Sequence, residues 1–287
     1  MPNSYVSRRS PEAQAQSAWV PPVGTLGELV IAAHARASIL RERAAELGRA
    51  AIAAPPVRSL RSELQGGTVG IIAEIKRASP SRGPINSELR AAAQAQAYER
   101  GGAFAISVLT EPSRFGGSND DIIAARSAAD IPLLKKDFHV EPVQLLEARA
   151  LGCSAALVIV RAVDPSTFAE LLQAGRRIGL ELIVEVRDEA ELDLALTVGA
   201  EIIGVNNRNL ESLAVDLVTM DRLLPLIPRS CIAVAESGIE SRADIERAGS
   251  HGADAVLIGS VLSGSATPEV TLRSLSGVER VTSARPN

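Results

Sequence analysis

Residues 70–76 read Gly-Ile-Ile-Ala-Glu-Ile-Lys, a short apolar run that ends with two charged side chains. Runs of the same kind, rich in valine, isoleucine and leucine, recur along the chain, and their starts lie 21 to 34 residues apart. Nearly continuous apolar strands separated by room for one helix are typical of a parallel sheet covered by helices on its outer face. The remaining predicted strands are Phe104–Leu109, Pro132–Lys136, Ala156–Val160, Glu181–Val186, Ile202–Val205, Cys231–Ala235 and Ala255–Ile258.

Eight such strand–helix units most economically close into a single (β/α)8 barrel, the TIM-barrel form of the α/β class. A doubly wound open sheet is the alternative, but it would require a glycine fingerprint directly after the first strand. The sequence Lys76-Arg77-Ala78-Ser79-Pro80 stands there instead. Several predicted helices end in glycines just before the next strand, where a left-handed residue can close the helix. These glycines are Gly101-Gly102, Gly152, Gly199 and Gly252.

The composition limits the classes of function. The chain has 287 residues, a formal net charge of −4 and 2% aromatic residues, so it lacks the basic field and stacking aromatics of a nucleic-acid-binding protein. Two cysteines and three scattered histidines show no ligand spacing, and we expect no metal site. No apolar run approaches the roughly 18 residues of a membrane span, and no apolar segment follows Arg8 and Arg9 as in an export signal. We therefore expect a cytoplasmic protein that binds neither membrane nor nucleic acid.

The chain divides into four predicted segments. Residues 1–22 are polar and rich in proline, and we expect a flexible tail. Residues 23–69 form an N-terminal helical extension that caps the barrel. It has a helical stretch from Leu26 to about Ala53, interrupted at Gly48, and a second helical piece near Val57–Gln65. Residues 70–275 form the catalytic barrel, and residues 276–287 are a C-terminal tail.

Charged side chains gather where the predicted strands end, which is where the active sites of barrel enzymes lie. Glu74 and Lys76 are two residues apart, so both point to one face of the first strand. Lys136 and Glu185 end two other strands. A lysine crowded by another cation should have a lowered pKa and a carboxylate in an apolar mouth a raised one, as general acids and bases require. The alternative is a ring of mutual salt bridges that closes the barrel top, and Glu236 fits that interpretation as well as a functional one.

The last two strands carry a separate signal. Ser237-Gly238 and Gly259-Ser260 place small residues and backbone N–H groups on adjacent loops, and we expect each pair to open a helical turn. This matches the phosphate site that many barrels build after their last strands. Ser79, in the first loop, could add a hydroxyl group. The residues therefore predict a metal-free barrel enzyme that acts on a phosphorylated anionic small molecule through lysine and glutamate acid–base chemistry.

The same residues carry a resemblance to a known family. Residues 74–83, Glu-Ile-Lys-Arg-Ala-Ser-Pro-Ser-Arg-Gly, resemble the first-strand signature of indole-3-glycerol-phosphate synthases from tryptophan biosynthesis. The resemblance covers roughly residues 60–262 and is most specific at the first and sixth strands. The further matching motifs are Ser107-Val108-Leu109-Thr110, Phe115-Gly116-Gly117-Ser118, Lys136-Asp137-Phe138, Glu185-Val186, Ile203-Gly204-Val205-Asn206-Asn207-Arg208-Asn209-Leu210, Ala235-Glu236-Ser237-Gly238-Ile239 and Leu257-Ile258-Gly259-Ser260.

The resemblance implies a carboxy-lyase that needs no cofactor. It implies conversion of 1-(2-carboxyphenylamino)-1-deoxyribulose 5-phosphate to indole-3-glycerol phosphate, CO2 and water, and association with other enzymes of the tryptophan pathway. Lys136 is the implied general acid, Lys76 the partner of the substrate carboxylate, and Glu185 and Glu74 the groups that move protons during dehydration. The other implied roles are positioning by Asn206 and Arg208, phosphate binding by Ser79, Gly238, Gly259 and Ser260, ring packing by Phe138, and substrate binding by Glu236 and Ser237.

The sequence departs from the family pattern at the rim of the site. Pro84, Arg187, Asn209 and Ser263-Gly264 stand where the family more often has other residues, as does the segment Ala33–Ser38. These departures affect the segment that caps the site and the affinity for substrate. They also leave open the alternative that the protein is a paralogue that serves a specialised indole product. A different sugar-phosphate barrel enzyme, such as an isomerase with a cysteine and aspartate pair, is a second rival interpretation. A non-catalytic barrel scaffold is a third.

Overall fold

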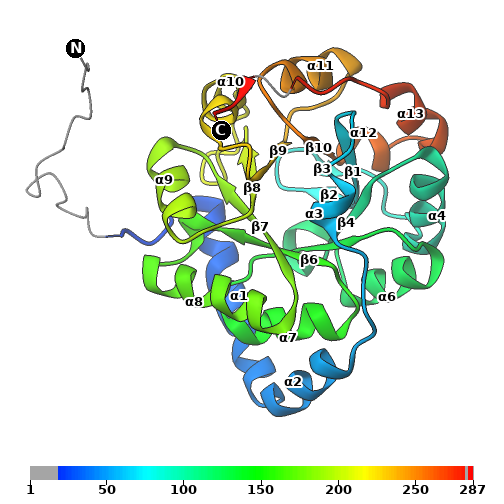
Figure 1. Cartoon of the computed structure of the whole chain (residues 1–287). Helices are drawn as coiled ribbons and strands as arrows, with labels where there is room; N and C mark the ends of the chain where they lie inside the picture. Colours follow the sequence, from blue (N-terminus) through cyan, green and yellow to red (C-terminus); the bar gives the residue numbers. More distant parts are fainter. Residues whose placement is uncertain (1–18, 282–283, 287) are drawn as a thin grey trace, which may run out of the picture.

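The computed structural model describes residues 19–281 and 284–286. Within these residues, eight parallel strands form a closed barrel in the order β1-β10-β9-β8-β7-β6-β5-β4, and Figure 1 shows the helices around it. The (β/α)8 prediction is confirmed, and each predicted strand agrees with the structure to within one residue at either end. The strands are β1 Gly70–Ile75, β4 Ala105–Leu109, β5 Leu133–Lys136, β6 Ala155–Ile159, β7 Glu181–Val186, β8 Ile202–Asn206, β9 Ile232–Glu236 and β10 Ala255–Ile258.

Helices follow the strands and cover their outer face. Gly102, Gly152, Gly199 and Gly252 all have positive φ values, from 82° to 97°, so these predicted helix-closing glycines do adopt the left-handed conformation. Beyond β1, a two-stranded hairpin of β2 Ala78–Ser79 and β3 Gly83–Pro84 lies in the first loop. The helices after the strands are α4 Ala91–Gly101, α5 Pro112–Phe115, α6 Asn119–Ala128, α7 Pro142–Ala150, α8 Pro165–Ile178, α9 Glu189–Thr197, α10 Val218–Leu223, α11 Arg242–Ser250, α12 Ser260–Ser263 and α13 Pro268–Leu275, with 3-10 turns η2 Val160–Ala162 and η3 Leu224–Leu226.

The N-terminal extension differs from its prediction. Helices α1 Gly24–Arg41 and α2 Ala44–Ala53 meet at Glu42–Arg43, whereas the predicted interruption at Gly48 lies inside α2. The bend occurs at Arg43 because α2 must turn to bury Leu47 and Ala51, and it then packs against α7. Figure 1 shows both helices, in blue, beside α7. The second predicted helical piece is shorter than expected, since α3 covers only Leu60–Glu63 after an N-cap at Ser59.

The extension contacts both ends of the barrel. At the amino end of the strands, Leu60 and Leu64 are buried, and the Ser59 hydroxyl donates a 2.6 Å hydrogen bond to Glu181, the first residue of β7. At the carboxyl end, Arg36 of α1 lies 2.8 Å from Asp137, which follows β5. The predicted flexible tail, residues 1–22, falls mostly outside the described residues.

The described C-terminal residues pack against the amino end of the barrel. Glu279 forms a β-bridge with Thr68. Arg280 and Arg285 both pair with Asp254, which directly precedes β10. Arg285 is 5% exposed, so the segment predicted as a tail is anchored there by a buried ion pair.

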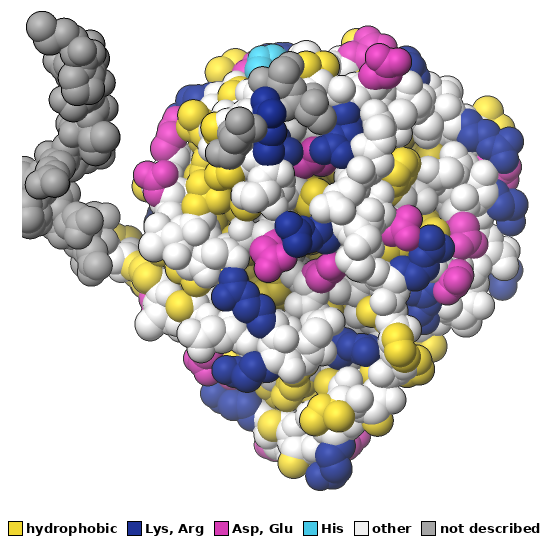
Figure 2. All heavy atoms as spheres, in the orientation of Figure 1, with side chains coloured by type: hydrophobic (Ala, Val, Ile, Leu, Met, Phe, Trp, Pro, Cys, Tyr) yellow, Lys and Arg dark blue, Asp and Glu magenta, His cyan; other side chains and the backbone are white. Residues whose placement is uncertain are grey.

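The surface charge, the helix lengths and the side-chain clusters can be compared with what nucleic acids, membranes and metal ions require. Figure 2 shows acidic and basic side chains intermixed over one face of the molecule, without one large field of positive charge. Among residues 19–281 and 284–286, no helix is long and apolar enough to cross a membrane. The same part of the chain contains no group of three histidine, cysteine or acidic residues arranged for a metal ion.

Candidate active site

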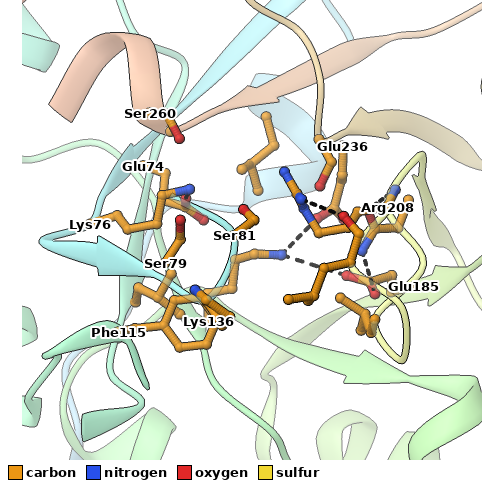
Figure 3. Close-up of a pocket in the computed structure, with 18 of the residues that line it drawn as sticks. Glu74, Lys76, Ser79, Ser81, Phe115, Lys136, Glu185, Arg208, Glu236 and Ser260 are labelled. Atoms are coloured by element: carbon orange, nitrogen blue, oxygen red, sulfur yellow. Dashed lines mark hydrogen bonds and ion pairs between the residues drawn. The ribbon is translucent and has the colours of Figure 1, made fainter. Parts of the chain in front are cut away.

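A pocket of about 1040 Å³, open solvent at its mouth included, lies at the carboxyl end of the strands. Every site residue predicted from the sequence lines it, and Figure 3 shows how several of them face one another. These residues are Glu74, Lys76, Ser79, Lys136, Phe138, Glu185, Asn206, Arg208, Glu236, Ser237, Gly238, Gly259 and Ser260.

One ion pair stands at the end of β1. Glu74 is 2% exposed, and its Oε1 lies 2.7 Å from Nζ of Lys76. The absence of a side chain at Gly259 makes room for both, since a Cβ there would lie 2.2 Å from Glu74 Oε1 and 2.6 Å from Lys76 Nζ. Ser263 holds the strand end: its hydroxyl accepts from the Lys76 N–H and donates to the Glu74 carbonyl. Ser263, one of the departures from the family pattern, therefore supports this pair.

A second group of charges is centred on Lys136. Its Nζ lies 2.7 Å from Glu236 Oε2 and 3.6 Å from Glu185 Oε2, so one ammonium group faces two buried carboxylates (Figure 3). Asn206 donates a 2.8 Å hydrogen bond to the other oxygen of Glu185. A Cβ at Gly204 of β8 would lie 2.2 Å from Glu236 Oε1, so that glycine leaves space for the carboxylate.

The pKa values of this group differ from the sequence prediction in one respect. Burial opposes the charge on Lys136, but Glu236, Glu185 and Glu74 outweigh it and raise the lysine pKa, so the predicted lowering is wrong here. The lysine faces carboxylates and not a second cation. Burial raises the pKa of Glu185 to about 7, against the opposing effects of Lys136 and Asn206, as predicted for a carboxylate in the mouth.

The alternative interpretation, a ring of mutual salt bridges that closes the barrel top, does not describe the geometry. The charges form two separate groups, one on Glu74 and Lys76 and one on Lys136. Within the described chain, Glu74 Oε2 and Glu236 Oε1 are buried without a hydrogen-bond partner. Buried polar atoms are rarely left so, and at a pocket they are available to a ligand.

The two predicted phosphate loops follow the paired strands β9 and β10, and both line the pocket. Ser237 and Gly238 have φ values of 65° and 76°, so their backbone turns away from β9 in a left-handed conformation. The predicted helical turn directly after this pair is wrong, because α11 begins only at Arg242, whereas α12 does begin at Ser260 as expected. Ser79 is 8% exposed, and its hydroxyl accepts from the Arg82 N–H across the hairpin turn.

Two aromatic rings and an ion pair at the rim complete the pocket. Phe138 and Phe115 have ring centroids 6.4 Å apart. Phe115 was not among the predicted site residues, although it stands in the motif Phe115-Gly116-Gly117-Ser118. Arg82 of the first loop pairs with Glu240, after β9, across the mouth. No sequence signal joins these two residues, which are 158 positions apart.

The N-terminal helix supports the strand end that carries Lys136. Arg36 lies 2.8 Å from Asp137 and 3.6 Å from Glu111, both buried. Burial alone would raise the pKa of Asp137, but Lys135, His139 and Arg36 together hold it below its usual value. Asp137 also accepts from Thr110. Sequence reasoning missed this network because its members come from distant parts of the chain.

Comparison with known proteins agrees with this geometry. A family model described as indole-3-glycerol phosphate synthase matches residues 29–275. Indole-3-glycerol phosphate synthase 2 of Streptomyces coelicolor is 43% identical over 88% of this chain and 99% of its own length. The indole-3-glycerol phosphate synthase of Mycolicibacterium smegmatis is 46% identical over 80% of this chain and 85% of its own. A solved mandelate oxidase structure, with 17% identity and a TM-score of 0.53 over 72% of this chain and 70% of its own, shares the fold alone.

Fold and site together define an enzyme of the (β/α)8-barrel class, with acidic and basic side chains gathered at the carboxyl end of the strands. Within that class, the chain belongs to the indole-3-glycerol phosphate synthase family. The family recognised from the sequence motifs is confirmed.

Proposed function

We propose that this protein converts 1-(2-carboxyphenylamino)-1-deoxyribulose 5-phosphate to indole-3-glycerol phosphate, CO2 and water, as a carboxy-lyase of tryptophan biosynthesis that needs no cofactor. The observation that carries this proposal is the position of Lys136, whose ammonium group stands between Glu185 and Glu236 in the same pocket as the Glu74–Lys76 pair. Family membership supplies the identity of the substrate.

Lys136 is the proposed general acid of ring closure. Its raised pKa keeps the ammonium form at neutral pH, so a proton is available to the ketone oxygen as the aromatic carbon attacks. The positive charge also stabilises the developing oxyanion. Lys76, paired with Glu74, is the proposed partner of the substrate carboxylate until CO2 leaves.

Glu185 is the proposed acid and base of the later steps, together with Glu74. A pKa of about 7 gives Glu185 both a protonated and an ionised form at neutral pH, which suits a group that gives and takes protons. Asn206 orients one oxygen of Glu185, and the Arg208 N–H in turn donates to the Asn206 side chain. Burial and nearby Arg82 lower the pKa of Arg208, the proposed substrate-positioning guanidinium.

The other residues of the pocket are proposed to bind the phosphate group and the anthranilate ring of the substrate. Gly238, Gly259, Ser260 and the hydroxyl of Ser79 would bind the phosphate, with Ser237 and Glu236 beside them. Phe138, with Phe115 next to it, would pack on the anthranilate ring.

The wider setting follows from the same substrate. A sugar phosphate is retained inside cells by its charge, and we propose a cytoplasmic location and association with other tryptophan-pathway enzymes. We also propose that residues 23–69 act as a cap, an arrangement supported by the Arg36–Asp137 pair beside Lys136.

The experiment is to mix the purified protein with the carboxyphenylamino-deoxyribulose phosphate and follow indole fluorescence. We expect a rise in fluorescence, and in Lys136→Ala a turnover number at least about 1000-fold lower with a folded barrel. A folded wild-type protein that binds the substrate without producing indole-3-glycerol phosphate would overturn the proposal.

A further inference from the structure

A second pocket lies behind Glu185. It has a volume of about 510 Å³, open solvent included, and shares four lining residues with the active-site pocket, among them Glu185 and Arg208. The two pockets therefore meet at these side chains, and Glu185 lines both. The rest of the side pocket is mostly polar, and its residues come from α1, η2, the end of β7, the first turn of α9 and the loop after β8. Its lining residues are Leu26, Ile159, Arg161, Glu185, Val186, Arg187, Asp188, Glu191, Arg208, Asn209, Leu210 and Glu211.

The proposed reaction consumes one proton in each turnover. The ketone oxygen of the substrate leaves as water and so takes up two protons. The CH2 carbon next to nitrogen loses one proton when the indole ring forms. The difference of one proton matches the loss of the carboxylate charge as neutral CO2. Glu185 lines both pockets, so when a substrate occupies the active-site pocket the side pocket offers a proton a second approach to this carboxyl group.

Glu191 stands in the side pocket at a place suited to carry that proton. It is the third residue of α9, and its Oε2 accepts a 2.8 Å hydrogen bond from the Arg187 N–H. Its own N–H donates to Asp188. Glu185 from β7 and Arg161 from η2 line the same pocket, and their charges act on Glu191. Arg208 and Glu211, from the loop after β8, line the same pocket.

The charge of Glu191 supports such a role. Burial, together with the charges of Asp188 and Glu185, raises the pKa of Glu191 to about 7, against the opposing effects of the Arg187 N–H and Arg161. Glu185 has its pKa raised to a similar value. Two carboxyl groups that line one pocket and have similar proton affinity can exchange a proton in either direction at little cost in free energy.

We propose that the side pocket is the route by which the net proton of each turnover enters, and that Glu191 relays it from solvent to Glu185. The Glu191 carboxyl gives its proton, through water in the pocket, to the Glu185 carboxylate and becomes a carboxylate itself. A proton from solvent then restores it. Glu191 acts through Glu185 and does not touch the substrate, and this inference rests on the proposed function.

The test is Glu191→Gln, which keeps an oxygen to accept from the Arg187 N–H and removes the exchangeable proton. We expect kcat to fall about tenfold at pH 8 in weak buffer, with KM unchanged. We expect imidazole, a small proton donor, to restore kcat, because it can deliver a proton to the side pocket. Glu189→Gln is the matched control, since Glu189 lies in the same helical turn but pairs with Arg222 at the surface. Its kcat should equal that of the wild type in every buffer.

Three outcomes separate the possibilities. Wild-type turnover with a Glu191→Gln variant that is equally fast in weak buffer would overturn the relay alone. A slower variant that imidazole does not restore would also overturn it, because Glu191 would then act only as a structural acceptor at the start of α9. A folded wild type without turnover would overturn the proposed function and the relay with it.

Discussion

The two ends of the barrel differ in how completely their buried carboxylates are hydrogen-bonded. At the amino end, Asp254 accepts hydrogen bonds from Arg280, Arg285 and the Ala233 N–H, so both of its oxygens are satisfied. Glu181, at the start of β7, likewise accepts from the Ser59 hydroxyl at one oxygen and from a backbone N–H of α3 at the other. These carboxylates join the terminal segments to the barrel.

At the carboxyl end, two carboxylates of the active-site pocket keep an oxygen that accepts no hydrogen bond from any described residue. Glu74 and Glu236 each have one buried oxygen without a partner in the described part of the protein, and Glu185 has a pKa near neutrality. A side chain that served only packing would have no reason to leave such atoms unsatisfied, since each costs about 1–3 kcal/mol. The comparison teaches that, among the described residues, a buried carboxylate oxygen without a partner marks the active-site pocket, since both such oxygens belong to residues that line it.

The largest expected effect is on stability, at the amino end. Asp254→Asn leaves the buried Arg285 and the partly buried Arg280 with only a neutral partner, and breaking a buried ion pair costs about 3–5 kcal/mol of unfolding free energy. Denaturant unfolding measures the loss, and kcat of the folded variant should stay unchanged. Glu246→Gln, which breaks an exposed pair with Arg242, is the control and should cost less than about 1 kcal/mol. A large loss of kcat in Asp254→Asn would contradict the distinction drawn between the two ends of the barrel.

The next effect is on activity, at the carboxyl end. Gly204→Ala places a Cβ against Glu236 Oε1 and pushes the carboxylate away from Lys136. We expect turnover to fall about 100-fold, as small misplacements in an active site do. Gly67→Ala is the control, because no described atom lies within 4 Å of a Cβ at that glycine near the amino end. Equal turnover of the two variants in the indole fluorescence assay would contradict the account.

A smaller effect is expected at the rim. Arg82 and Glu240 are each about half exposed, so their ion pair contributes at most about 1 kcal/mol to holding the first loop over the mouth. Arg82→Ala should therefore raise KM about threefold and leave kcat nearly unchanged. Arg43→Ala removes a comparable exposed pair, with Glu46, on the N-terminal extension and should leave both constants as they are. Steady-state kinetics at two salt concentrations sharpen the result, since high salt should reduce the difference.

Much of the barrel could be predicted because its signals are local. Each strand is a short apolar run, and the site residues at the mouth, apart from Ser79 in the first loop, stand at or just after a strand end. The bend at Arg43 could not be predicted, because it depends on how Leu47 packs against α7, almost 100 residues away. The raised pKa of Lys136 was missed for the same reason, since its carboxylate partners come from β7 and β9.

The most direct test of the central claim is the melting temperature of Glu185→Gln at pH 8 and pH 4, measured with its turnover. Glu185 has a pKa of about 7 in the folded protein against an ordinary 4.5, so its ionisation reduces stability as the pH rises through 7 and has no effect below 4.5. The account predicts that the variant turns over at least about 100-fold more slowly. It also predicts that the variant melts several degrees higher than the wild type at pH 8, and that the two melt alike at pH 4. A variant that is less stable than the wild type at pH 8 would contradict it, because Glu185 would then serve the structure.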